Sequence, residues 1–124
     1  MTKGKMISPY AFPGIKHHLL PKKFYVKKPV LSPEKLMELI ANQTFTTISD
    51  IISVTRKSEV VVARHIFCGI MRKDYDYSLK FIGDMIKRDH TTIMNAVMQF
   101  DNRSSNEEFF GDLVNQIRKT ITNY

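Results

Sequence analysis

The chain has 124 residues and a formal net charge of +7, and 43% of its residues are hydrophobic. This length is sufficient for one compact domain and too short for a large catalytic domain with a separate recognition module. The hydrophobic fraction excludes a wholly disordered chain. The basic charge indicates an acidic partner, and nucleic acid is the commonest one for a small basic protein.

The excess positive charge is confined to the first thirty residues. Residues 1–30 contain seven lysines and no acidic residue, which leaves 12 of the 19 basic side chains to cancel the 12 acidic ones in residues 31–124. Four prolines in the same segment disfavour regular structure. We therefore predict an irregular basic arm, rich in proline and lysine, over 1–30 and a helical domain over 31–124. The arm is either a solvated linker or a segment that contacts phosphates or a partner.

Cysteine and apolar content indicate the compartment. Cys68 is the only cysteine, so no disulfide forms within the chain. The longest apolar stretches are too short to span a bilayer, and the N-terminus lacks the apolar core of a signal peptide. We expect a cytoplasmic protein with no membrane partner.

Two helices are expected at the start of the domain, because the sequence has no hairpin dipeptide and no convincing alternation of apolar and polar residues. The run 32–34, Ser-Pro-Glu, is typical of a helix start, and this helix is expected to end near Gln43. A short second helix is predicted over about 49–54. The isoleucines expected to be buried there are Ile48, Ile51 and Ile52.

Ser58 is expected to cap a longer helix. Its buried face has the spacing i, i+3, i+4 and i+7 and consists of Ala63, Ile66, Phe67 and Ile70. The β-branched run Val60–Val62 equally allows a strand to start here. We favour the helix, because the helical spacing continues to Met71.

A helix-turn-helix is predicted over about residues 78–102. Ser78 caps a first short helix, in which Gly83 allows another helix to approach closely. A break at Lys87 and Arg88 follows, and Asp89 caps the second helix. The apolar face of that second helix consists of Ile93, Ala96, Val97 and Phe100, and its opposite face of Thr91, Asn95 and Met98.

A last helix is expected to open near Asn106 and to close the core. Its inward residues are predicted to be Phe110, Leu113, Val114 and Ile117. The predicted fold class is therefore all-α, with five or six helices that include a helix-turn-helix, preceded by the basic arm.

The first turn of the helix that Asp89 opens has two interpretations. It is wholly polar and follows two basic residues, which is typical of a helix end that enters the major groove of DNA. Simple capping by Asp89, with His90 and Thr91 merely solvated, explains the same pattern. On spacing alone, capping is the favoured interpretation.

Residues 78–84, Ser-Leu-Lys-Phe-Ile-Gly-Asp, and 88–93, Arg-Asp-His-Thr-Thr-Ile, resemble the C-terminal DNA-binding domain of the bacterial replication initiator DnaA. The string Arg-Asp-His-Thr-Thr opens the recognition helix of that family, and the likeness extends more loosely over about 35–100. It implies a Trp-repressor-like fold and double-stranded DNA as the partner. Together with the faces and charges described above, it marks ten candidate DNA-binding residues: Arg56, Arg64, Arg72, Lys87, Arg88, Asp89, His90, Thr91, Thr92 and Asn95.

The resemblance also implies individual roles. Asp89, His90 and Thr91 would read base edges in the major groove, with Thr92 and Arg88 beside them at bases or phosphates. Arg56 would enter the adjacent minor groove. Solvated helix surface and phosphate contact are equal alternatives for Arg64 and Arg72.

The chain departs from the family pattern at two places. Where the family has Phe-Gly-Gly before Arg-Asp-His, this chain has Ile86-Lys87, one residue shorter, which is expected to change the turn. The family's Pro-Arg-Gln is replaced by Ala63-Arg64-His65, and Glu59 adds an acid to a normally basic stretch. We expect affinity for the family's usual DNA site to be weakened or redirected.

The sequence gives no indication of an enzyme. It has no G-x-x-x-x-G-K-[ST] loop, so the ATPase module of a full initiator is not expected, and no metal-ligand spacing or nucleophile elbow is present. No cofactor, metal or small-molecule substrate is therefore expected. The function predicted is sequence-specific binding of double-stranded DNA by a stand-alone DnaA-like domain, of the kind a phage, plasmid or mobile element carries, in replication initiation control or transcription regulation.

An alternative of another class remains open. The chain is then a protein-interaction module of a phage or mobile element that binds a host replication protein or a virion component, with DNA contact incidental. The first function places the protein at the nucleoid, or in the host cytoplasm if a phage encodes it.

Overall fold

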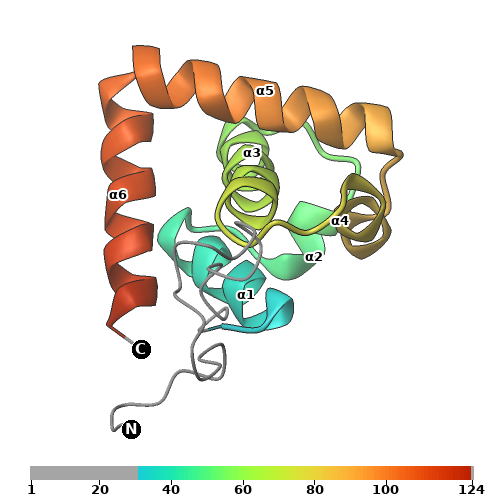
Figure 1. Cartoon of the computed structure of the whole chain (residues 1–124), viewed down its shortest axis with the longest axis horizontal. Coiled ribbons are helices and arrows are strands. Elements are labelled where there is room, and N and C mark those ends of the chain that lie inside the picture. The colour runs from blue at the N-terminus through green and yellow to red at the C-terminus, as the bar shows by residue number, and fades with distance from the viewer. Residues whose placement is uncertain (1–30, 124) are drawn as a thin grey trace, which may run out of the picture.

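Six helices make up the part of the chain that the computed structural model describes, residues 31–123 (Figure 1). They are α1 (Pro33–Gln43), α2 (Ile48–Ile52), α3 (Ser58–Lys73), α4 (Leu79–Ile86), α5 (His90–Asn106) and α6 (Glu108–Thr122). Within that range no strand is present, so the predicted all-α class is confirmed. The predicted arm over 1–30 lies outside the described residues.

Three predicted helix starts are confirmed. The Ser32 hydroxyl accepts a hydrogen bond from the Lys35 amide at 3.3 Å, and the Ser78 hydroxyl accepts one from the Phe81 amide at 3.1 Å. Asp89 caps α5 in the same way. Each bond satisfies one of the amides that the first turn of a helix leaves unpaired.

The start of α3 differs from the prediction. Lys57, not Ser58, occupies the N-cap position, Ser58 is the first helical residue, and no side-chain cap bond is present. Val60–Val62 are helical, so the strand alternative was wrong. Val60 is buried and its two neighbours are half-buried, and packing of this side of α3 overrides the weak helix propensity of the run.

The short helix α2 begins one residue earlier than predicted, after a capping box formed by Thr47 and Asp50. Of the isoleucines expected to be buried, Ile51 is fully buried and Ile52 is half-buried, but Ile48 remains 37% exposed. Burial of Ile48 was therefore a wrong prediction. A helix of five residues has only one and a half turns, and its first residue lies at the edge of the face that it packs.

Helix α3 lies at the centre of the molecule, with α5 crossing it and α6 running down the side (Figure 1). All four residues of its predicted face are fully buried. The crossing with α5 is close at Gly69, where a Cβ atom would lie 2.1 Å from Cγ of Phe100. Glycine is needed at this position because a larger residue would collide with the phenyl ring.

Helices α5 and α6 complete the core. Of the predicted face of α5, Ile93, Ala96 and Phe100 are buried and Val97 is half-buried. The four predicted inward residues of α6 are all buried. None of the described helices has the length and apolar character required to cross a membrane.

Candidate nucleic-acid interface

The first turn of α5 projects from the domain. Residues 89–92, which we name the leading turn, are all exposed, as the sequence predicts for a turn that can meet a partner. Oδ1 of Asp89 accepts a hydrogen bond from the Thr92 amide at 2.8 Å, and this bond is the main cause that lowers the pKa of Asp89. The carboxylate therefore caps the helix in its charged form.

The turn between α4 and α5 consists of residues 87–89. Lys87 adopts a left-handed conformation, with φ 59° and ψ 48°, which a helix end usually assigns to glycine. Its side chain is exposed, and no carboxylate of the described residues lies within 4 Å of it. Lys87 thus places an unneutralised cation next to the leading turn.

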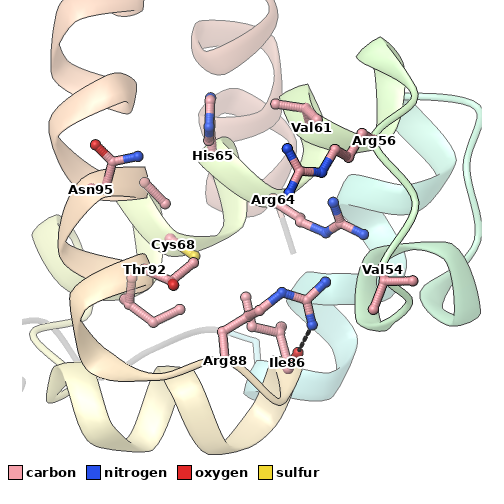
Figure 2. Close-up of a pocket in the computed structure, with 12 residues that line it drawn as sticks. Val54, Arg56, Val61, Arg64, His65, Cys68, Ile86, Arg88, Thr92 and Asn95 are labelled. Atoms are coloured by element: carbon pink, nitrogen blue, oxygen red, sulfur yellow. Dashed lines mark hydrogen bonds between the residues drawn. The ribbon is translucent and has the colours of Figure 1, made fainter.

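A groove of about 470 Å³ lies beside the leading turn (Figure 2). One wall is α5, which contributes Thr92 and Asn95, and the opposite wall is the loop of residues 53–57 with Arg56. The buried floor includes Cys68. The structure therefore places Arg56 across a hollow from the start of α5.

Two arginines at the groove turn inward to the protein backbone. Arg64 donates four hydrogen bonds to carbonyl oxygens of residues 50–55. Arg88 donates to the carbonyls of Ile52 and Ser53 and to two carbonyls at the end of α4. Burial, and next the charge of Arg88, lower the pKa of Arg64. Both side chains line the groove, while Nε, Nη1 and Nη2 of Arg64 and Nη1 and Nη2 of Arg88 donate to protein carbonyls.

The structure separates Arg72 from the other candidates. It lies in the last turn of α3, exposed, and its Nη1 donates to the carbonyl oxygen of Tyr77 at 3.0 Å. It does not line the groove. The candidates that gather around the groove and the leading turn are Arg56, Arg64, Lys87, Arg88, Asp89, His90, Thr91, Thr92 and Asn95.

Val54 and His65 also line the groove, although neither was among the predicted site residues. Val54 is an apolar side chain that is 85% exposed in the wall formed by loop 53–57, and no pattern in the sequence indicates this exposure. His65 also lines the groove, and its Nδ1 lies 3.3 Å from Nη1 of Arg103. Burial, and next the Arg103 charge, lower the pKa of His65 to about 4, so its imidazole is neutral near pH 7. In the sequence, the only indication that His65 belongs to the site is its position next to Arg64.

Cys68 has the environment of an inert thiol. It is fully buried in α3, and burial raises its pKa to about 12. A thiol with such a pKa holds almost no reactive thiolate near neutral pH.

Comparison with known proteins identifies the family. The family described as bacterial dnaA protein helix-turn-helix matches residues 33–99, which include α1 to α4 and the exposed start of α5. The chain belongs to this family. The resemblance stated from the string Arg-Asp-His-Thr-Thr is thereby confirmed, and membership of the DnaA helix-turn-helix family supports double-stranded DNA as the partner of the domain.

Individual relatives are named chromosomal replication initiator protein DnaA. The chromosomal replication initiator protein DnaA of Bdellovibrio bacteriovorus is 29% identical over 126 residues, covering 99% of this chain and 27% of that protein. The DnaA of Spiroplasma citri is 33% identical over 92 residues, covering 73% of this chain and 20% of the relative. That of a Picosynechococcus species is 29% identical over 94 residues, covering 75% and 21%. The chain thus spans about a quarter or less of the length of these relatives.

Proposed function

We propose that this domain binds double-stranded DNA in a sequence-specific manner, with the leading turn in the major groove and Arg56 in the neighbouring minor groove. The observation that carries the proposal is the exposed polar leading turn beside the unneutralised cation of Lys87. The groove between α5 and loop 53–57 leaves room for one sugar-phosphate backbone of the duplex between the leading turn and Arg56.

The chemistry of each side chain suits its proposed role. His90 and Thr91 are exposed at the first positions of α5 and present a ring nitrogen, a hydroxyl and a methyl group to base edges. A carboxylate oxygen of Asp89 can accept a hydrogen bond from the N4 amino group of cytosine. We assign Lys87 and Asn95 to contacts with phosphates on either side of the bases that the leading turn reads. Arg72 contributes at most a phosphate contact at the margin, because it lies outside the groove.

The biological process is inferred from the relatives. The three reported proteins named chromosomal replication initiators match this chain over 73% to 99% of its length. We infer a role in replication initiation control or transcription regulation, at the nucleoid and without a catalytic activity.

A mobility-shift titration tests the proposal. A duplex that carries the DNA site of DnaA and a scrambled duplex of the same composition are compared at physiological salt. We expect binding to the former to be at least about fivefold tighter, because the weakest good bidentate base contact is worth about 1 kcal/mol. Equal affinity for the two duplexes would refute the specificity, and no binding to either would refute DNA as the partner.

One observation favours the alternative of a protein-interaction module. Phe45 and Phe109 are 94% and 75% exposed and do not line the groove. Large exposed apolar side chains contribute to surfaces that meet other proteins where they form a contiguous patch. Under this alternative, substitution of Phe45 or Phe109 abolishes function, whereas substitution of His90 or Thr91 leaves it intact.

A further inference from the structure

The C-terminal end of α2 is held by arginine side chains. The last carbonyls of a helix have no partner within the helix, and here four successive carbonyls accept from guanidinium groups. The Asp50 and Ile51 carbonyls accept from Arg64 at 3.1 and 2.8 Å, and the Ile52 carbonyl accepts from Arg88 at 3.3 Å. The carbonyl of Ser53 accepts from both arginines.

These two arginines come from different parts of the domain. Arg64 lies on α3, and it also donates to the Thr55 carbonyl in loop 53–57 at 2.6 Å. Arg88 lies in the turn before α5 and donates to the carbonyls of Ile86 and Lys87 at 3.1 and 3.2 Å. Both side chains reach toward the same loop in Figure 2. Loop 53–57 is therefore tied to α3 and to the turn that leads into α5.

Only arginine can make this set of contacts. Its planar guanidinium carries five donors in a rigid fork, whereas lysine offers three donors at one point. The bonds of Arg64 use Nε, Nη1 and Nη2, so they spread over the whole fork. Among the described residues, no carboxylate lies within 4 Å of Arg64 or Arg88. Backbone carbonyls at the negative end of α2 take the place of an acidic partner.

We propose that Arg64 and Arg88 are positioning residues that fix the spacing between Arg56 in loop 53–57 and the leading turn of α5. This inference rests on the proposed DNA-binding function and assigns to both arginines a role other than phosphate contact. With the spacing fixed, the minor-groove and major-groove contacts meet one duplex together. If the bonds to residues 50–55 are lost, loop 53–57 becomes mobile. Binding is then weaker to a duplex that Arg56 and the leading turn contact together.

Charge-conserving variants test the proposal. Arg64→Lys and Arg88→Lys keep the positive charge and lose the fork, so we expect about tenfold weaker binding to the preferred duplex. Affinity for scrambled duplex and its dependence on salt should stay as in the wild type, because the number of cations is unchanged. Arg118→Lys is the matched control, since the guanidinium of Arg118 makes its fork contact with Asp74 outside the groove, and this variant should bind DNA like the wild type.

The opposite pattern would overturn the proposal. If Arg64→Lys binds the preferred duplex like the wild type, while Arg64→Gln binds all duplexes more weakly with a salt slope reduced by about one, then Arg64 contacts a phosphate. The same comparison applies to Arg88.

A measurement on the free protein separates this proposal from the proposed function. Backbone order parameters of residues 53–57 from nitrogen-15 relaxation should fall from about 0.85 to below about 0.6 in Arg64→Lys or Arg88→Lys. Those of α6 should stay unchanged, which shows that the variant is folded. Unchanged order parameters in loop 53–57 in both variants would overturn the positioning role. Failure of the wild type to prefer any duplex would instead refute the proposed function alone.

Discussion

The carbonyl oxygen of Arg88 lies 2.4 Å from the point that a Cβ atom on Gly83 would occupy. The sequence predicts that Gly83 admits another helix, and Cγ1 of Ile93 in α5 does lie 3.5 Å from the same point. The closest approach, however, is made by the backbone of the turn that leads into α5. Only a residue without a Cβ atom permits this close return of the chain.

Gly83→Ala is therefore expected to destabilise the domain. The new methyl group meets backbone, which cannot move aside as a flexible side chain can, so we expect a loss of about 2 kcal/mol in the free energy of unfolding. Urea denaturation measures the loss. Lys80→Ala, on the exposed face of the same helix, should change the stability by less than about 0.5 kcal/mol. Equal stability of Gly83→Ala and the wild type would contradict the geometry of the turn.

Lys87→Gly is expected to raise stability and to lower affinity for DNA. Glycine adopts the left-handed conformation of position 87 without a Cβ penalty, and we expect a gain of about 0.5 to 1 kcal/mol. Lys87→Gln keeps the strained backbone and also lacks the charge. The two variants should therefore bind duplex DNA equally weakly and differ in urea midpoint. A lower midpoint for Lys87→Gly than for Lys87→Gln would show that the side chain, and not the backbone, dominates at this position.

Asp89 variants separate capping from base recognition. Asparagine caps helices about as well as aspartate, so Asp89→Asn should keep the wild-type melting temperature, whereas Asp89→Ala should lower it. Asparagine pairs with adenine, while aspartate accepts from cytosine. In competition binding with single-base variants of the preferred duplex, Asp89→Asn should favour adenine where the wild type favours cytosine. Unchanged preference would mean that Asp89 only caps the helix.

Acid should weaken the fold partly through His65. Its pKa is about 4 in the folded protein and 6.5 in the reference state, so between these values the unfolded chain binds a proton that the native ring does not. Stability from this residue is complete above pH 6.5 and is lost as the pH falls to about 4.

The variant His65→Gln isolates this contribution. Since the ring is partly open to solvent, we expect the wild type to lose on the order of 1 to 2 kcal/mol more than His65→Gln between pH 6.5 and 4. Parallel stability curves for the two proteins would exclude a lowered pKa for His65.

Local signals in the sequence predicted most of the fold. The caps at Ser32, Ser78 and Asp89 and the apolar faces of α3 and α6 depend on neighbours within one or two turns, which a sequence shows directly. The exposure of the leading turn followed from its polarity in the same way.

The orientation of the arginines could not be predicted, because it depends on contacts distant in sequence. The partners of Arg64 lie up to 14 residues away, and Arg88 reaches a carbonyl 35 residues away. The sequence shows that these residues are basic and predicts that they lie on the DNA-binding side of the domain. That their guanidinium groups donate to protein carbonyls is seen only once α2 is packed beside them.

Selection of duplexes from a random library tests the central claim most directly. Bound duplexes are recovered with the wild type and with His90→Ala and Thr91→Ala, each on a domain whose folding is verified by its melting temperature. We predict that the wild type selects one motif and that each variant loses preference at particular base pairs of that motif, because each removes one base-edge contact. Recovery of no motif, or of the same motif by all three proteins, would contradict base recognition by the leading turn.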